Sequence, residues 1–219
     1  MGGGAIGNYA LFVGGIGESG SYAVSTATAN AVTSSMTVTT PTNLSAARHF
    51  IASTKVGNYL VFAGGLKTQI ETSTTTSDTV TANVDAYDMS LVKSTPTDLS
   101  EARYKIAAAS VGNYALFAGG NTSASSSSRS SSNIDVYDTN LTKGTTLYLP
   151  KGRVGLGGAS TETYAMFVGG KGAVDCDLYD SNLVRQSGEA ITTAAPVSGI
   201  AFKDWALFAS ATTLNAYSI

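Results

Sequence analysis

Three arginines recur at equivalent positions along the chain, and their type and spacing suit ligand binding. Arg48, Arg103 and Arg153 follow one another at intervals of 55 and 50 residues, with His49 and Tyr104 directly after two of them. A guanidinium group presents N–H donors in a planar fork that matches anionic and polar ligands. A ring of such groups would bind an anion or a glycan. Each arginine could instead bridge to the backbone or to an Asp of a neighbouring repeat unit, and the sequence leaves both interpretations open.

No catalytic residue, cofactor or metal ion is expected. His49 is the only histidine, which is too few for a histidine-rich zinc or copper site, and no nucleophile motif accompanies it. Cys176 is the only cysteine, and the negative charges of Asp175 and Asp177 oppose a reactive thiolate. The other aspartates recur at repeated turn positions, whereas a catalytic pair would occur once. We therefore predict that the protein is not an enzyme.

Charge and hydropathy exclude two classes of partner. The net charge is -2, and charged residues make up 13% of the chain. This composition provides no basic surface for nucleic acid and no polybasic segment for anionic lipid. No apolar run reaches the length of a membrane-spanning helix, so we expect no membrane insertion. The abundant Gly, Ser and Thr favour short strands joined by small-residue turns.

A motif of aromatic and apolar residues ending in two glycines repeats along the chain. It begins at Asn8, Asn58, Asn113 and Thr163 as Asn/Thr-Tyr-x-x-Phe-x-Gly-Gly, and a degenerate copy begins at Asp204. The intervals are 50, 55, 50 and 41 residues. A period near 50 residues is typical of one four-stranded repeat unit. A glycine pair at a strand end allows a positive φ and close backbone approach.

Three further elements accompany each copy of this motif. A small-residue strand precedes it, as at 106–111, and an x-Asp-x-Tyr-Asp strand follows it, as at 133–138. A more polar strand comes last, as at 141–149. No segment shows a sustained helical period. Each unit is therefore expected to form four short strands, with small side chains on the innermost one.

The repeat resembles the kelch family over essentially the whole chain. The resemblance is carried by the glycine pairs, the recurring arginines and the tyrosines of the third strand. It implies an all-β fold, a β-propeller of four-stranded blades, with five blades and an incomplete last one. The usual Trp between the third and fourth strands is absent, and the pattern is closer to bacterial and bacteriophage kelch-like arrays. The expected blades cover about 2–47, 48–102, 103–152, 153–194 and 195–219. A piece of a larger propeller is the alternative.

The segments between the second and third strands vary most in length. Residues 16–28, 66–82 and 121–132 are rich in Ser and Thr, whereas 171–173 is short. Solvated flexible loops are one interpretation. The other is a ligand-binding face, because length variation on one face of a repeat protein often marks the binding surface. Arg129 lies in the serine-rich segment of this face.

The sequence therefore predicts a non-catalytic binding or structural propeller. Its loop-and-arginine face would meet a protein or glycan partner, and the family resemblance suggests a phage tail or a bacterial surface outside the cytoplasm. The alternatives are a carbohydrate-binding lectin module and an intracellular protein-interaction scaffold. Self-association through the open strand edge of the last blade is also expected to be feasible.

Overall fold

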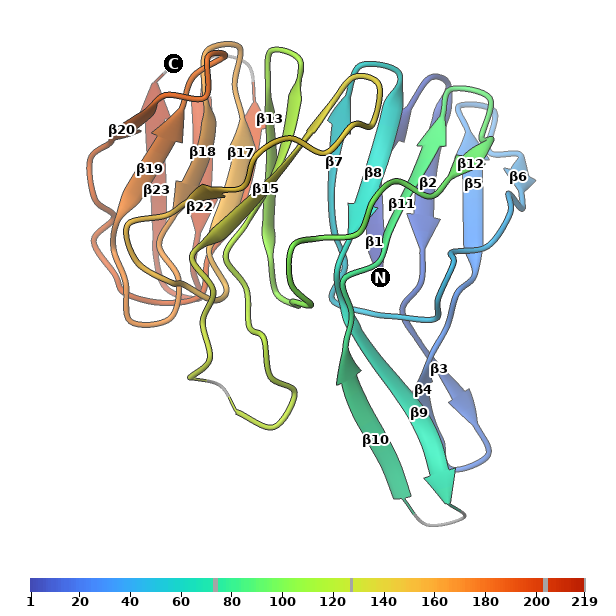
Figure 1. Cartoon of the computed structure of the whole chain (residues 1–219). Coiled ribbons are helices and arrows are strands. Elements are labelled where there is room, and N and C mark those ends of the chain that lie inside the picture. Colours follow the sequence, from blue (N-terminus) through green and yellow to red (C-terminus); the bar gives the residue numbers. More distant parts are fainter. Residues whose placement is uncertain (73–74, 127, 203–204, 219) are drawn as a thin grey trace.

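The computed structural model describes residues 1–72, 75–126, 128–202 and 205–218, and in this part of the chain it contains strands and no helix. Five small antiparallel sheets are arranged as the blades of a five-bladed β-propeller (Figure 1). The predicted all-β propeller is thus confirmed. Within the described ranges, no helix is long and apolar enough to cross a membrane.

The sheets follow one another along the chain, and each is ordered from the innermost strand outward. Blade 1 contains β1 (Gly2–Ile6), β2 (Tyr9–Val13), β5 (Ala29–Thr33) and β6 (Val38–Thr39). Blade 2 contains β7 (Ala52–Val56), β8 (Tyr59–Ala63), β11 (Val84–Asp88) and β12 (Lys93–Ser94). Blade 3 contains β13 (Ala107–Val111), β14 (Tyr114–Ala118), β15 (Asn133–Asp138) and β16 (Leu147–Tyr148). Blade 4 contains β17 (Gly157–Ser160), β18 (Ala165–Val168), β19 (Cys176–Tyr179) and β20 (Arg185–Ser187). Blade 5 contains β21 (Ser198–Phe202), β22 (Trp205–Ala209) and β23 (Leu214–Ser218).

The second strand of each inner blade is buried on both faces. In β8 and β14 every residue after the leading Tyr is buried. Side chains alternate between the two faces of a strand, so Phe62 and Phe117 point toward the preceding blade while their neighbours point toward the next one. These strands contain continuous apolar runs because another blade packs on each face of their sheet.

The glycine pair joins consecutive blades. Gly64 and Gly65 have φ values of 63° and 125°, which disfavour other residues. A Cβ on Gly64 would lie 2.4 Å from the carbonyl oxygen of Arg103. The N–H of Gly65 donates a hydrogen bond to that oxygen over 2.9 Å. The glycine pair is therefore needed because the segment that enters the next blade, at Arg103, passes close to the end of β8.

An Asp at the end of the third strand organises the turn into the fourth. The carboxylate of Asp88 accepts hydrogen bonds from the backbone N–H groups of Ser90 and Val92, over 2.8 and 2.9 Å. Leu91 has a φ of 63° inside this turn. Asp138 and Asp180 make the same contacts in the next two blades. These aspartates are turn residues, as their repetition predicted.

Neighbouring blades pack through aromatic side chains. Each junction has a Phe from the second strand and a Tyr from the third strand of the same blade in an edge-to-face contact. The pairs are Phe62–Tyr87, Phe117–Tyr137, Phe167–Tyr179 and Phe208–Tyr217. The tyrosine hydroxyl donates to a backbone carbonyl in the preceding blade, as from Tyr137 to Thr97 over 2.7 Å.

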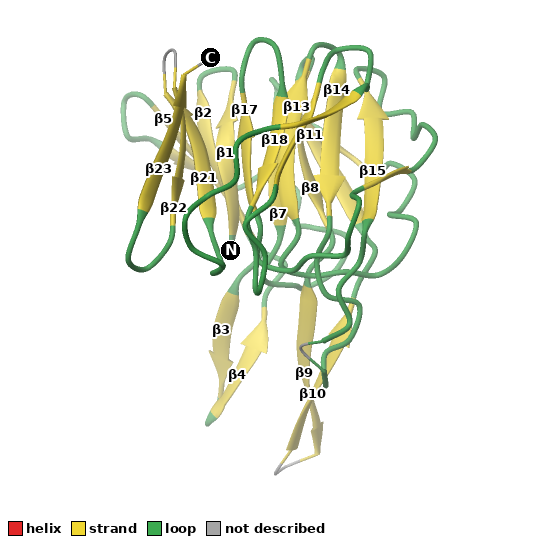
Figure 2. Ribbon diagram, turned by 90° about the vertical axis from the view of Figure 1, so that its left-hand side faces the viewer, coloured by secondary structure: helices red, strands yellow, loops and turns green. Residues whose placement is uncertain are grey.

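Two of the predicted loops are β-hairpins. β3 (Ile16–Ser19) pairs with β4 (Tyr22–Ser25), and β9 (Leu66–Thr72) pairs with β10 (Thr75–Val80). Both hairpins project from the same side of the propeller, β4 lies against β9, and residues 121–126 and 128–132 extend on that side too (Figures 1 and 2). We call this side the loop face. The opposite side, formed by the short turns after the first and third strands of each blade, is the turn face.

Candidate binding face

The three recurring arginines are buried, which corrects their prediction as ligand-binding residues. Arg48 and Arg103 have no exposed surface, and Arg153 is 2% exposed. Each forms an ion pair with an Asp of the third strand of its own repeat unit: Arg48 Nη1 lies 2.8 Å from Asp85, and Arg103 and Arg153 pair with Asp135 and Asp177. A ligand cannot reach these guanidinium groups in the folded protein. The geometry supports a structural role instead: the guanidinium group pairs within its own repeat unit, and the carbonyl of the same arginine accepts a hydrogen bond from the glycine pair of the preceding blade.

Further hydrogen bonds fix each arginine in its junction. Arg103 Nη1 donates to the carbonyls of Gly119 and Asn133, both over 2.7 Å. Burial lowers the pKa of Arg103, and the negative charge of Asp135 acts in the opposite direction. The same Asp135 accepts from the backbone N–H of Ser100 and pairs with Lys143 at 3.1 Å. These partners are needed because a buried charge without partners is costly. The Nε atom of Arg103 remains without a hydrogen-bond partner.

His49 supports the two hairpins and is not an open ligand site. Its side chain is 5% exposed, and Nδ1 lies 3.0 Å from the hydroxyl oxygen of Ser25 in β4. That hydroxyl oxygen accepts a hydrogen bond from the backbone N–H of Thr68 in β9 over 2.8 Å. Burial lowers the pKa of His49, while Asp78 raises it. The prediction for His49 is therefore corrected: it holds the bases of two hairpins together.

Tyr104 belongs to a cluster on the loop face that the sequence did not reveal as a unit. Lys105 Nζ lies 5.3 Å from the ring centroid of Phe50 and 5.5 Å from that of Tyr104. The two rings are 6.1 Å apart. Tyr104 itself is buried and receives a hydrogen bond from Asn121. Of the predicted residues, it is the one that lines a pocket, although its exposed surface is small.

The pocket beside this cluster has a volume of about 220 Å³. Its wall contains Tyr104, Lys105, Asn121, Gly155, Lys171 and Pro196. These residues come from the segments that enter the third, fourth and fifth blades and from the connections after β14 and β18. An aromatic ring, an amide and two ammonium groups meet here, which suits a polar ligand with a flat face.

The backbone under the cluster is unusual. Phe50 and Lys105 have φ values of 52° and 54°, a conformation that costs free energy for residues with a side chain. The equivalent position in the next unit is Gly155, with a φ of 67°. Phe50 nevertheless is 48% exposed, so its large side chain fills no core. Two repeats thus keep large side chains where a third uses glycine.

Arg129 stands apart from the other predicted residues. It is exposed in the serine-rich segment, and its carbonyl accepts a hydrogen bond from the backbone N–H of Thr122. The segment is fastened at its base by Asn121, whose side chain donates to the carbonyl of Ser126 over 2.7 Å. The structure therefore does not bring Arg129 into one site with the three buried arginines.

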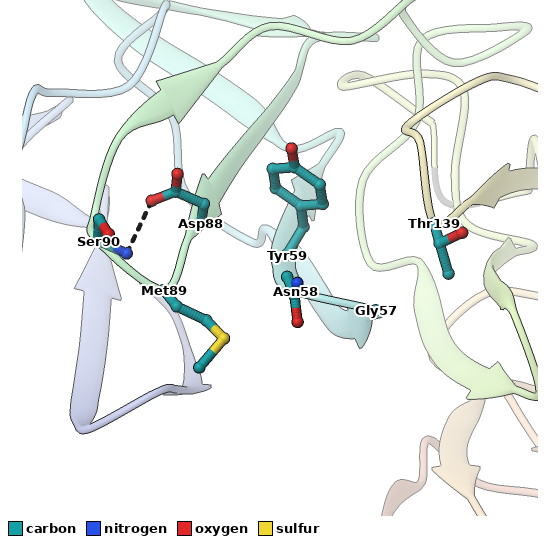
Figure 3. Close-up of a pocket in the computed structure, with 7 residues that line it drawn as sticks. All are labelled: Gly57, Asn58, Tyr59, Asp88, Met89, Ser90 and Thr139. Atoms are coloured by element: carbon teal, nitrogen blue, oxygen red, sulfur yellow. Dashed lines mark hydrogen bonds between the residues drawn. The ribbon is translucent and has the colours of Figure 1, made fainter.

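The turn face carries a broader hollow of about 490 Å³. Figure 3 shows Tyr59 standing between the Asp88–Ser90 turn and Thr139, with Gly57 and Asn58 at its edge. The carboxylate of Asp88 is already engaged by the backbone of its own turn. This hollow is formed by repeated turn elements, and it lacks the cationic and aromatic grouping of the loop-face pocket.

A metal centre and a reactive cysteine are two other kinds of candidate site. In the part of the chain that the structure describes, no group of three or more His, Cys, Asp or Glu side chains could hold a metal ion. Cys176 is buried, and burial raises its pKa to about 11, with Asp177 adding to the shift. A thiol with such a pKa is protonated at neutral pH and is a poor nucleophile.

Comparison with known proteins identifies the fold and no family. No protein-family profile matches the chain, and no curated protein sequence matches it. Solved structures do match. The structure of YjhT superposes with a TM-score of 0.72 at 10% sequence identity, and the match covers 99% of this chain and 83% of that chain. At this identity the likeness shows a shared β-propeller architecture and nothing about activity.

Proposed function

We propose that this chain is a non-catalytic binding propeller of kelch type whose loop face holds a protein or glycan partner. One observation carries the proposal: Phe50 and Lys105 keep exposed, large side chains at a left-handed backbone position where the next repeat has Gly155. Strain of this kind persists where function requires the side chain. The two hairpins and the serine-rich segment extend the same face.

The kelch assignment and the placement on a phage tail or bacterial surface rest on the sequence pattern. The glycine pairs, the buried arginines and the third-strand tyrosines act together at the junctions between blades 1 and 2, 2 and 3, and 3 and 4, which explains why such a pattern repeats. Propellers support many unrelated activities, so the site and not the fold must carry the function.

A lectin is the more specific form of this proposal. The exposed ring of Phe50, together with the ring of Tyr104 and the ammonium of Lys105, offers an apolar face and a cationic group side by side. This combination suits a sugar ring, which has both kinds of surface. An intracellular scaffold would instead use the hairpins, whose exposed Ile16 and Ile70 are apolar.

The test replaces Phe50 and Lys105, two non-glycine residues with a left-handed backbone on the loop face, by glycine. We expect Phe50→Gly and Lys105→Gly to leave the melting temperature unchanged or raised, because glycine relieves the backbone, while ligand-induced thermal stabilisation is lost. The probes are a panel of neutral and acidic oligosaccharides and labelled bacterial cells. Met36→Gly is the matched control, because Met36 has a φ of 60° and lies away from the loop face. Unchanged binding by both loop-face variants would contradict the proposal.

A second pair of variants separates the lectin from the hairpin-mediated alternatives. Replacing residues 16–26 or 66–80 by the short connection 171–173 of blade 4 removes one hairpin each. A lectin built on the Phe50–Lys105 cluster keeps glycan binding after removal of the 16–26 hairpin. A protein-binding face loses its partner when either hairpin is removed.

A further inference from the structure

The two β-hairpins on the loop face, which together we call the arm, carry an excess of negative charge. Glu18 in β3, Glu71 in β9 and Asp78 in β10 are all exposed. Lys67 is the only cationic residue in 16–26 and 66–80. Hydroxyl groups of the arm itself donate to Glu71 and Asp78. Among the described residues, none of the ion pairs includes any of these three carboxylates.

The connections of blades 3 and 4 on the same face carry exposed cations. Lys105, Arg129 and Lys151 are exposed there, and the ion pairs of the described part of the chain do not include them. The ammonium of Lys105 lies over the rings of Phe50 and Tyr104 instead of beside a carboxylate. These cations therefore lack an anionic partner within the described chain.

This second region stays positive after its own acidic residues are counted. We call it the basic half of the loop face, and it consists of residues 101–106, 121–132, 150–155 and 171–175. Lys171 is its fourth exposed cation, and Glu101 and Asp175 are its carboxylates. Its two buried arginines are neutralised by their own ion pairs. Four cations against two carboxylates give a charge of +2, and one cation against three carboxylates gives the arm -2.

The arm and the basic half also differ in height. Figure 1 shows the arm and residues 121–126 and 128–132 on different sides of the loop face, and in Figures 1 and 2 the arm reaches further from the propeller. The loop face therefore has one projecting half that is acidic and one lower half that is basic. A twofold axis in the plane of this face would bring the projecting half of each of two copies over the lower half of the other.

Exposed apolar side chains accompany these charges. Ile16 and Ile70 of the arm are 58% and 42% exposed, and Phe50 beside the basic half is 48% exposed. Protein interfaces combine apolar contacts with a polar and charged rim. Burial of the apolar side chains would supply the driving force for association, and the opposite charges would select the orientation.

We infer that the loop faces of two copies of this chain interlock, with the acidic arm of each copy bound over the basic half of the other. The inference names a protein partner for the loop face, so it rests on the proposed function in its protein-binding form. A second copy fits better than an unrelated basic protein, because each copy that offers an acidic arm also offers the surface that neutralises it. In a twofold dimer the contact between arm and basic half forms twice.

The mass in solution tests the dimer. Sedimentation over a range of protein concentrations should show twice the mass of the chain, with a dissociation constant that rises with salt because exposed charges are screened. The arm variant Glu18→Lys, Glu71→Lys and the basic-half variant Lys105→Glu, Lys151→Glu should each raise that constant at least about tenfold. The control Glu162→Lys reverses an exposed charge on the turn face and should leave it unchanged.

An equimolar mixture of the arm variant and the basic-half variant tests the geometry. In the mixed dimer a reversed arm meets a reversed basic half, and an unsubstituted arm meets an unsubstituted basic half. Both contacts are then again between opposite charges. We expect dimers in the mixture at a protein concentration where each variant alone is monomeric.

Three results would overturn the inference. They are a chain that stays monomeric at every concentration, a dimer that neither variant weakens, and a mixture that stays monomeric. Circular dichroism and thermal melting check that the variants are folded. If a charge-reversed variant does not fold, the chain with 66–80 replaced by the connection 171–173 takes its place. This shortened chain should be monomeric, and a dimer formed by it would contradict the inference as well.

Failure of the dimer and failure of the proposed function have different readouts. Binding of saccharides and bacterial cells is measured by thermal stabilisation, and dimerisation is measured by mass. A monomeric chain whose probe binding is lost in Phe50→Gly contradicts the dimer and leaves the proposed function in place. A dimer whose probe binding is unchanged in both Phe50→Gly and Lys105→Gly contradicts the proposed ligand cluster and leaves the dimer in place.

Discussion

The junction between blades 3 and 4 and the junction between blades 4 and 5 are built on the same plan but differ in charge. In the first, Arg153 is buried and paired with Asp177. In the second, the carbonyl that meets the glycine pair belongs to Ala195, and the third-strand position holds Asn215. Both members of the ion pair are replaced together. The difference teaches that the pair acts as a unit, and that a terminal blade is joined without it by the apolar packing of Phe208 with Ala159 and Val168 of blade 4.

The largest effect should come from removing one member of an inner pair. Arg103→Ala leaves Asp135 buried without its main partner, and we expect a loss of about 3–5 kcal/mol in the free energy of unfolding. Denaturant unfolding measures this loss. The double variant Arg103→Ala, Asp135→Asn copies the junction between blades 4 and 5, and it should be more stable than the single variant. A double variant as unstable as the single one would show that the two junctions are not equivalent.

A comparison of equivalent phenylalanines should separate inner from terminal blades. Phe117→Ala removes a fully buried ring at an inner junction and should cost about 3–5 kcal/mol. Phe12→Ala acts on the exposed wall of blade 1 and should cost less than about 1 kcal/mol. Chemical denaturation of the two variants under the same conditions checks both values. Similar losses would mean that the wall of blade 1 is covered in solution.

The junction tyrosines allow a smaller and more specific change. Tyr137→Phe keeps the ring but removes the hydrogen bond to Thr97, which should cost about 1 kcal/mol. Tyr217→Phe removes the corresponding bond to Glu189 in the terminal junction, where solvent can replace it, and should cost less. Thermal unfolding of the two variants gives the comparison. The order of the two losses, more than their size, tests the contrast between junctions.

The same tyrosines should make stability fall in alkali. Burial raises the pKa of Tyr87 and of Tyr179 to about 12, above the ordinary value of 10.0. The folded protein then holds these protons more tightly than the unfolded chain, so the stabilisation is complete below pH 10 and is lost as the pH rises toward 12. Melting temperatures between pH 9 and pH 11 should fall, and less steeply for Tyr87→Phe. Tyr148→Phe, at an exposed position, is the control and should follow the unsubstituted chain.

The repeat made the fold predictable, because five copies of one strand motif at similar intervals require five similar units. The arginines were harder to interpret. Periodicity shows that Arg48, Arg103 and Arg153 share one environment, but it does not say whether that environment is solvent or core. The decisive partner of Arg103 is Asp135, which lies 32 residues further along the chain. Only the folding of the third strand beside the segment that enters the same blade brings the two together.

The binding cluster could not be predicted because, unlike the arginines, its residues do not recur in the repeat. Phe50 and Lys105 occupy equivalent positions but differ in type, so they carry no repeat signal, and their left-handed backbone is invisible in the sequence. The composition of the Ser- and Thr-rich segments 16–28 and 66–82 favours loops. Thr is β-branched and fits an extended strand, so the same composition is compatible with the hairpins β3–β4 and β9–β10.

The outermost strands of blades 1 to 4 are only two or three residues long. A strand so short exposes too few backbone donors and acceptors to template the addition of another chain. The rim formed by blades 1 to 4 is thus protected against sheet-to-sheet aggregation without a covering helix. Many copies of this protein can be packed side by side at high local concentration along these blades without their edges becoming seeds for fibres, whereas blade 5 presents the longer edge strand β23.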